Sequence, residues 1–328
     1  MTSTLLERYR RTIEDALRLA FRGQTRLHEI MRYHVGLIDR DGHPTAFLGK
    51  LLRPTLTLFT AEELGGDALT ALPAAVGLEL VHGFSLIHDD VQDRDETRRG
   101  RPAVWALWGI PEAINAGDLM QAVAVRCALD ASAEAAKILL EATVEMIEGQ
   151  SMDLAFEKRF VAPAEVLAMV DKKTGALFRC AFELGGYCSG ADEEAMKRLG
   201  AIGRCVGRAF QIQDDLLGIW GDEEVTGKPI GSDIRRKKKS YPVALAHAKA
   251  GAEDREELER LYATETMEAS DVRWVAALFE RLGIRDEGRD AVGAYVSEAI
   301  DSIDAVSFSA NGREALHALI ESLSGREK

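Results

Sequence analysis

The stretch from Glu79 to Trp105 constrains the fold of this chain more than any other part of its sequence. It begins as an apolar run typical of a buried helix and then carries three carboxylates, Asp89, Asp90 and Asp93. In a helix, Asp89 and Asp93 share a face with their Cβ atoms about 6 Å apart, so their charges repel. Anions at the end of a buried helix need a compensating cation, which is either a metal ion or a basic side chain.

Two consecutive arginines, Arg98 and Arg99, follow these carboxylates. Paired carboxylates suit Mg2+, which keeps several waters and is usually completed by the phosphates of a substrate. Guanidinium groups bind phosphate in a bidentate manner. The stretch therefore predicts a site for a metal ion and a diphosphate.

A second acidic pair, Asp214 and Asp215, lies near the end of another long apolar segment. A single such pair is most often a helix cap or part of a solvated face. Two pairs, each preceded by an apolar run and followed by basic residues, are difficult to explain by packing. If they face each other across a helix bundle, they can hold divalent ions that bind a diphosphate.

Several basic residues are ambiguous when each is taken alone. Lys50 and Arg53 are three positions apart on one face of a predicted helix, where they either extend to the surface or bind an anion. Lys173 precedes Thr174 and a glycine, which is the pattern of a helix C-terminus. The basic run at 235–239 has the composition of a solvated loop. His82 lies two turns before Asp89. Taken alone, it is either an ordinary core or surface histidine or a phosphate ligand.

Helical periodicity extends along nearly the whole chain, and only 8 prolines interrupt it. We find no sustained strand alternation, no internal repeat and no linker, so the sequence predicts one large all-α domain over residues 1–328. Besides the helix that leads to Asp89, the predicted helices cover 2–21, 24–38, 47–64, 110–129, 134–156, 164–184, 192–220, 242–249, 254–265, 270–282, 287–304 and 311–324, with a loop at 221–240.

The charge balance narrows the partners of this chain. Lys and Arg number 41 against 54 Asp and Glu, and the net charge of −13 argues against a nucleic-acid partner and weakly against anionic membranes. The 4 cysteines form no Cys-x-x-Cys pair, which favours a reducing compartment. We see neither a signal peptide nor an apolar run of membrane-spanning length, so we expect a cytoplasmic protein without stable membrane insertion.

The ordered set of motifs resembles that of the trans-polyprenyl diphosphate synthases, over nearly the whole length of the chain. The matching positions are Gly49-Lys50-x-x-Arg53-Pro54, His82, Asp89-Asp90-x-x-Asp93, Arg98-Arg99-Gly100, Lys173-Thr174, Phe210-Gln211-x-x-Asp214-Asp215, Lys228 and Asp233. The resemblance implies the isoprenoid synthase type I fold, a helical bundle with a central cavity. It also implies a homodimer that uses Mg2+ to join isopentenyl diphosphate to an allylic diphosphate, namely dimethylallyl, geranyl or farnesyl diphosphate.

The resemblance also implies a role for each matching residue. Isopentenyl diphosphate would be held by four residues, Lys50, Arg53, His82 and Arg99. About three Mg2+ ions per active site would be bound by the two acidic motifs. In the first motif, Asp89 and Asp93 would bind two ions with Asp90 assisting, and in the second motif Asp214, paired with Asp215, would bind a third. The allylic diphosphate would be held by Arg98, Lys173, Lys228 and Lys238, where the choice of Lys238 over its neighbours depends on its spacing from Asp233. The reacting carbons would lie beside Thr174 and Gln211.

Two departures from the family pattern occur, and the product length is open. Leu48 replaces the first glycine before Lys50, and Gly218 replaces the last aspartate of the second motif. The aromatic Phe84 and small Ser85, five and four positions before Asp89, resemble the pattern of short-chain enzymes and favour C20 over C15, unless Phe84 is ordinary core. A class I terpene cyclase would need a different second metal motif and no second diphosphate site. A non-catalytic regulatory subunit would be expected to lose one acidic motif.

Overall fold

The computed structural model describes residues 2–45, 48–221 and 231–324. Helices dominate this part of the chain, so the all-α fold class is confirmed. Contacts divide the chain into two compact units. Unit 1 comprises 1–144, 177–200 and 303–315, and unit 2 comprises 145–176, 201–302 and 316–328. The single domain and the central cavity stay predictions.

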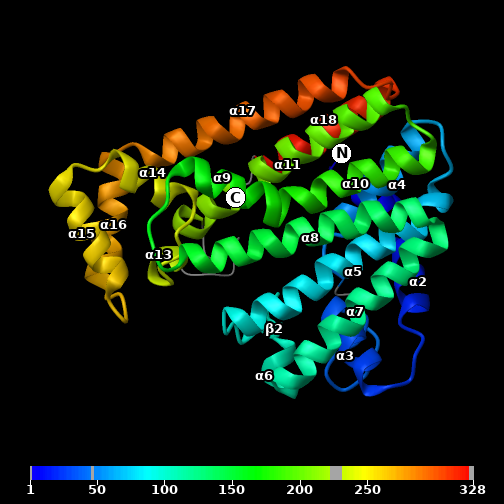
Figure 1. Ribbon diagram of the computed structural model, residues 1–328, viewed down its shortest axis with the longest axis horizontal. Coiled ribbons are helices and arrows are strands. Elements are labelled where there is room, and N and C mark those ends of the chain that lie inside the picture. Colours follow the sequence, from blue (N-terminus) through cyan, green and yellow to red (C-terminus); the bar gives the residue numbers. More distant parts are fainter. Residues whose placement is uncertain (1, 46–47, 222–230, 325–328) are drawn as a thin grey trace. The chain divides into compact units, whose positions relative to one another are not determined.

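Unit 1 is built around α5, which spans Ala68–Gln92 and carries the first acidic motif at its end. The Asp67 side chain caps its N-terminus by accepting a hydrogen bond from the backbone N–H of Leu69 at 2.9 Å. The helix α7 (Ile110–Ala131) lies beside α5, as Figure 1 shows, and a Cβ at Gly77 would be 2.8 Å from the Ala124 carbonyl oxygen. The absence of a side chain at Gly77 therefore permits a close approach of the two helices.

Other helices of unit 1 complete the surroundings of α5. They are α1 (Thr2–Arg8), α2 (Arg10–Ala20), α3 (Arg26–Val35), α4 (Leu52–Glu63) and α6 (Val104–Trp108), together with the first part of α8 (Ala133–Phe156) and most of α10 (Ala176–Ser189). Among the described helices, α5 alone is long and apolar enough to cross a membrane by length and composition. Most of its apolar residues are buried in the core of unit 1.

Unit 2 carries the second acidic motif on α11, which spans Glu193–Trp220 and belongs to unit 2 from Ala201 onwards. Its core includes Ile212, Val275, Leu278 and Phe279, which are fully buried. The other elements are α9 (Pro163–Val170), the π-helical segment η1 (Asp171–Gly175), α13 (Ser232–Arg235), α14 (Tyr241–Lys249), α15 (Ala252–Ala263), α16 (Ala269–Arg281) and most of α17 (Ile284–Asp304), with α18 (Ala310–Ser324) divided between the units.

Several predicted boundaries were wrong. The predicted helix over 2–21 is interrupted at Tyr9, and the helix predicted from 47 begins only at Leu52 because Leu51 has a left-handed backbone with φ of 50°. Pro54 therefore lies in the first turn, where its missing N–H costs no hydrogen bond. The predicted 164–184 helix contains the π-helical segment and extends to Ser189, and the predicted 221–240 loop contains α13.

Candidate functional site

A short β-hairpin, which the sequence did not predict, positions the consecutive arginines Arg98 and Arg99 of unit 1. Strands β1 (Thr97–Arg98) and β2 (Arg101–Pro102) are antiparallel, and both turn residues have positive φ, 53° at Arg99 and 71° at Gly100. This is the backbone of a type I′ turn, in which a glycine at the second position avoids steric strain. The Arg-Arg-Gly sequence thus supplies both the turn and the two guanidinium groups.

Arg98 is held by the first acidic motif. Its Nε donates a hydrogen bond to Asp90 Oδ1 at 2.7 Å, and one terminal nitrogen lies 2.6 Å from the same oxygen as an ion pair. The Asp90 side chain is 1% exposed, and its other oxygen, Oδ2, is buried without a hydrogen-bond partner. Burial raises the pKa of Asp90, while the hydrogen bond from Arg98 opposes that rise. On the same helix, Asp89 is half-buried and Asp93 is exposed, so their carboxylates are more accessible to a cation from solvent.

Arg99 lies in a second group of unit 1, with Arg53, Glu79 and His82. The Arg53 side chain is buried, its guanidinium carbon is 4.6 Å from the centre of the Phe178 ring, and its Nε has no hydrogen-bond partner. Arg53 therefore does not extend to the surface. Burial lowers the pKa of Arg53 to about 10, which still leaves it charged at neutral pH.

Burial and neighbouring positive charge together decide the protonation of His82. Desolvation, then the charges of Arg53 and Arg99, lower the pKa of His82 well below its usual range, so the imidazole is neutral at pH 7. Burial raises the pKa of Glu79, while Arg99 and Arg53 oppose the rise. Sequence reasoning assigned no role to Glu79, although it lies one helical turn before His82.

Lys50 differs from the prediction. It is exposed and precedes α4, so it does not share a helix face with Arg53. The lack of a side chain at position 49 has a structural explanation, because a Cβ on Gly49 would be 2.9 Å from the guanidinium atoms of Arg99. The Gly49 backbone therefore lies directly against a side chain of the hairpin.

The two residues predicted to control product length lie inside unit 1. Phe84 is 3% exposed, and its ring packs against the His88 ring in a T-shaped arrangement with centroids 5.8 Å apart. Ser85 is 8% exposed and its hydroxyl donates to the His82 carbonyl oxygen at 2.9 Å. Both are on α5, close to the first acidic motif in sequence and in the helix.

In unit 2, a chain of hydrogen bonds joins the predicted residues. The Thr174 hydroxyl donates to Gln211 Oε1 at 2.7 Å, and Gln211 Nε2 donates to Asp215 Oδ1 at 3.0 Å. Asp215 is buried, with its side chain 3% exposed, whereas Asp214 is exposed. The Asp215 Oδ2 atom accepts a hydrogen bond from the backbone N–H of Tyr241 at 3.2 Å.

The three lysines of the basic run have separate partners. Lys238 Nζ is 2.8 Å from Asp215 Oδ1 and 3.7 Å from Asp233 Oδ2. Lys237 instead donates to the carbonyl oxygens of Thr264 and Glu265, and Lys239 to that of Glu157. The structure thus brings Lys238, and neither neighbour, to the second acidic pair. Lys228 lies outside the described residues.

The two acidic motifs have the same internal arrangement. In each pair the second aspartate, Asp90 or Asp215, is buried and bonded to a basic side chain, Arg98 or Lys238. The first aspartate, Asp89 or Asp214, is more exposed. The buried member fixes a cation, and the other is more accessible to a ligand.

Lys173 lies in η1 rather than at a helix C-terminus, and its ion-pair partner, Asp153, was not predicted from the sequence. Its Nζ is 2.5 Å from Asp153 Oδ2 on α8, with both side chains about a quarter exposed, 25% and 27%. Glu148-Gly149-Gln150 precedes Asp153 within the same helix. Only the fold brings these segments together, because 20 positions separate the two residues.

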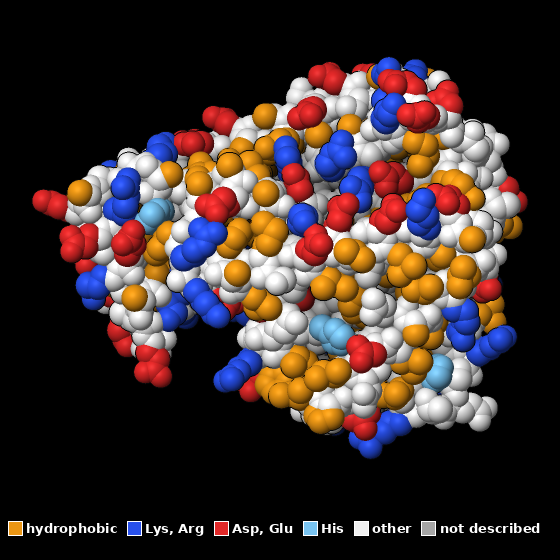
Figure 2. All heavy atoms as spheres, in the orientation of Figure 1, with side chains coloured by type: hydrophobic (Ala, Val, Ile, Leu, Met, Phe, Trp, Pro, Cys, Tyr) orange, Lys and Arg blue, Asp and Glu red, His pale blue; other side chains and the backbone are white. Residues whose placement is uncertain are grey.

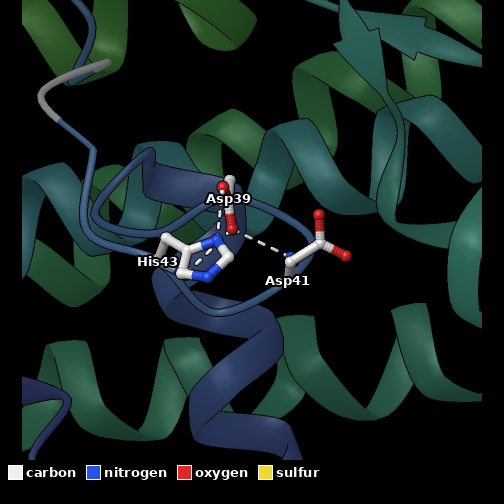
Figure 3. A group of neighbouring side chains, drawn as sticks. All are labelled: Asp39, Asp41 and His43. Carbon is white, nitrogen blue, oxygen red and sulfur yellow. Dashed lines mark hydrogen bonds and ion pairs between the residues drawn. The ribbon is translucent and has the colours of Figure 1, made fainter.

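One further group of possible metal ligands lies in a turn of unit 1. Among the described residues, Asp39, Asp41 and His43 offer ligand atoms within 4.8 Å of one another (Figure 3). The turn itself explains this group, because Asp39 Oδ1 accepts hydrogen bonds from the backbone N–H groups of Asp41 and His43, each at 2.9 Å. Figure 3 shows the Asp41 carboxylate directed away from the other two side chains.

Comparison with known proteins places this site in context. The family profile described as Polyprenyl synthetase matches residues 43–279. The chain is 41% identical over 298 residues to a (2E,6E)-farnesyl diphosphate synthase of Mycobacterium tuberculosis, covering 87% of this chain and 82% of that protein. It is 37% identical over 321 residues to a geranylgeranyl diphosphate synthase of the same species, covering 93% and 91%.

Solved structures give the same result for the fold. A polyprenyl synthetase from Streptomyces coelicolor A3(2) superposes with a TM-score of 0.91 at 37% identity, covering 98% of this chain and 99% of that chain. A geranylgeranyl pyrophosphate synthetase from Pyrococcus horikoshii superposes with a TM-score of 0.88 at 33% identity, covering 99% of both chains.

Proposed function

The chain belongs to the polyprenyl synthetase family, and we propose that it joins isopentenyl diphosphate to an allylic diphosphate, giving a short-chain all-trans prenyl diphosphate. It is a trans-prenyltransferase with the helical fold of that family. The observation that carries the proposal is the shared arrangement of the two acidic motifs, in which a buried aspartate fixes Arg98 or Lys238 beside a more exposed aspartate. A terpene cyclase would not need the separate cationic group around Arg53.

The cationic group of unit 1 is the proposed site for isopentenyl diphosphate. Arg53 and Arg99 supply positive charge, neutral His82 supplies a hydrogen bond, and exposed Lys50 completes the site from the segment before α4. Arg53 Nε is buried without a partner, as expected of a donor that awaits an anionic ligand. The left-handed turn directs Arg98 and Arg99 to different groups, which supports one arginine for each diphosphate.

The acidic motifs are the proposed sites for Mg2+ and the allylic diphosphate. The donor set fits this ion, because it consists of carboxylate oxygens, and Asp90 Oδ2 is a buried acceptor without a donor. Asp89 and Asp93, with Asp90 assisting, would hold two ions, and Asp214, in the pair with Asp215, would hold a third. Arg98, Lys173, Lys238 and Lys228 would bind the diphosphate oxygens. When bound, Mg2+ neutralises charge on the leaving diphosphate.

The reaction needs charge stabilisation and the exclusion of water. The allylic C–O bond breaks, and its electrons leave with the diphosphate, whose added negative charge Arg98, Lys173 and Lys238 stabilise. The double bond of isopentenyl diphosphate attacks the allylic cation, and a carbon–carbon bond forms. A proton then leaves the new cation for the departed diphosphate, and a new double bond results. Thr174 and Gln211, which bond to each other at 2.7 Å, would border the reacting carbons.

The product length is proposed as C20 first and C15 second. Phe84 would end the space for the growing chain, and Ser85 would leave room beside it. Relatives are named as farnesyl, geranylgeranyl and geranylfarnesyl diphosphate synthases, so the family relationship is compatible with several lengths. The allylic substrate would be dimethylallyl, geranyl or farnesyl diphosphate.

We also propose that the protein is a cytoplasmic homodimer. In unit 1, Ile110 and Ile114 on α7 are 48% and 43% exposed, and Leu140 and Val144 on α8 are 41% and 56% exposed. Each pair has a spacing of four residues, so each forms an apolar strip on its helix. Figure 2 shows hydrophobic side chains over α6 and the adjoining start of α7. Such surfaces are typical of contacts between subunits. Sedimentation as a monomer at micromolar concentration would contradict the dimer.

The decisive experiment is incubation of the purified chain with labelled isopentenyl diphosphate, Mg2+ and each of the three allylic diphosphates. Chromatographic sizing of the products identifies both the preferred substrate and the product length. We expect condensation with at least one allylic substrate, and its absence with all three would overturn the proposal. Asp89→Ala should abolish turnover with an unchanged thermal unfolding curve, because the residue is only half-buried; retained turnover would contradict its metal role.

A further inference from the structure

The segment η1 in unit 2 is a π-helical turn between two α-helical segments. It spans Asp171–Gly175 and contains both Lys173 and Thr174. The backbone is helical on either side, with φ and ψ of −60° and −42° at Val170 and −57° and −42° at Ala176. A π-helical turn inserts an extra residue and is less favourable than α-helix, so it persists where the surroundings hold it.

Close backbone contacts hold this turn on two sides. A Cβ at Gly149 on α8 would be 2.3 Å from the Lys173 backbone nitrogen. A Cβ at Gly207 on α11 would be 2.6 Å from Gly175 Cα. Any side chain at either glycine would therefore have to displace the backbone of the turn, which is far more rigid than a side-chain end.

An ion pair joins the start of the turn to α11. Arg208 donates from Nε and from one terminal nitrogen to the two carboxylate oxygens of Asp171, each at 2.6 Å. Both side chains are less than a third exposed, 30% and 27%, so water screens this pair incompletely. Arg208 is also fixed from its other side, because its guanidinium carbon is 5.1 Å from the centre of the Tyr295 ring.

We propose that the Asp171–Arg208 ion pair is a positioning element that holds η1 so that Lys173 reaches the allylic diphosphate and Thr174 borders the reacting carbons. This inference rests on the proposed function. Within the turn, consecutive side chains contact different helices: Lys173 contacts Asp153 on α8, and Thr174 contacts Gln211 on α11. Arg208 is one turn before Gln211 on α11, so the ion pair sets the register between the turn and the helix that carries the second acidic motif.

The ion pair is distinct from the residues proposed to touch substrate. Its loss should therefore affect the allylic substrate, one of whose proposed ligands, Lys173, lies on η1, more than isopentenyl diphosphate, none of whose proposed ligands lies there. Displacement of a catalytic group by about 1 Å can lower the rate on the order of a hundredfold. A general loss of folding would instead lower activity toward both substrates in proportion.

The test compares Asp171→Asn and Arg208→Lys with a matched control in the same turn, Lys172→Gln. The control removes the exposed ion pair of Lys172 with Glu148, which also joins η1 to another helix and is 2.5 Å long. Arg208→Lys keeps the charge and loses the bidentate geometry, so it stays informative if Asp171→Asn does not fold. Steady-state kinetics with each substrate varied in turn provides the first measurement. Hydrogen exchange of residues 169–176 in the ligand-free protein provides the second.

We expect both ion-pair variants to lower kcat/KM for the allylic substrate by about tenfold or more, with the KM for isopentenyl diphosphate changed less than about twofold. Exchange in the turn should accelerate by about tenfold, and the control should match wild type in both measurements. Wild-type kinetics in Arg208→Lys, or equal losses for both substrates, would overturn the positioning role. Absence of condensation by the wild-type chain would overturn the proposed function itself, and the inference with it.

Discussion

Gly218 is the departure from the family pattern that the structure explains most directly, and its replacement gives the sharpest prediction. A Cβ at Gly218 would be 2.2 Å from Asp233 Oδ2 and 2.4 Å from its Cγ. The Asp233 side chain is 11% exposed and lies 3.7 Å from Lys238 Nζ. The missing side chain at Gly218 therefore makes room for the Asp233 carboxylate.

Restoring the family's aspartate should consequently impair the protein. In Gly218→Ala, the Asp233 carboxylate must withdraw by more than about 1 Å, and overpacking of this kind costs about 1–3 kcal/mol. In Gly218→Asp, a second carboxylate within about 4 Å adds repulsion of up to about 4 kcal/mol at an effective dielectric constant of 20, partly offset by Lys238. We therefore expect losses in free energy of unfolding of about 2 kcal/mol for Ala and about 3 kcal/mol or more for Asp.

Urea unfolding measures these losses. We expect turnover to fall as well, because a displaced Asp233 would disturb Lys238, which also contacts Asp215. The control is Gly293→Ala on α17, where nothing lies within 4 Å and the substitution should raise stability by up to about 1 kcal/mol. Asp233→Ser combined with Gly218→Asp should recover at least about 1 kcal/mol of coupling energy. A Gly218→Asp variant as stable and active as wild type would refute the steric reasoning.

Three further predictions follow from unit 1. Phe84→Ala should lengthen the product, because it removes a buried ring from the proposed floor; an unchanged product distribution by chromatography would contradict this role. Gly49→Ala should raise the KM for isopentenyl diphosphate on the order of tenfold by displacing Arg99, with the allylic KM nearly constant, and equal effects on both would argue against it. Burial and nearby arginines lower the pKa of His34 to about 3, so below pH 6.5 the unfolded chain binds a proton that the folded chain does not, and stability falls. By pH 5 this proton linkage lowers the free energy of unfolding by about 2 kcal/mol. Urea unfolding should show that His34→Gln lacks this loss between pH 6.5 and pH 5. The same dependence of stability on pH in the wild type and the variant would disprove it.

The sequence was a good guide to the helices, whereas the roles of the site residues stay predictions. Long apolar segments ending in acidic pairs predicted α5 and α11, because helical periodicity is a local property. Boundaries at left-handed residues were not predictable, since Leu51 and Arg99 adopt positive φ only where tertiary contacts impose it. The π-helical turn was missed for the same reason, because its stabilising contacts come from α8 and α11.

The sequence by itself determined the family, the fold class and the order of the charged motifs along the chain. Only the tertiary structure decided which member of each motif is buried. Asp90 and Asp215 bind Arg98 and Lys238, which lie 8 and 23 positions later in the chain, whereas the neighbouring Asp89 and Asp214 are more exposed. Composition cannot distinguish Lys238 from the lysines beside it, whereas the direction of each side chain from the backbone can. The sequence gives the sign of each charged side chain, whereas the packing of the folded chain decides which oppositely charged group it contacts.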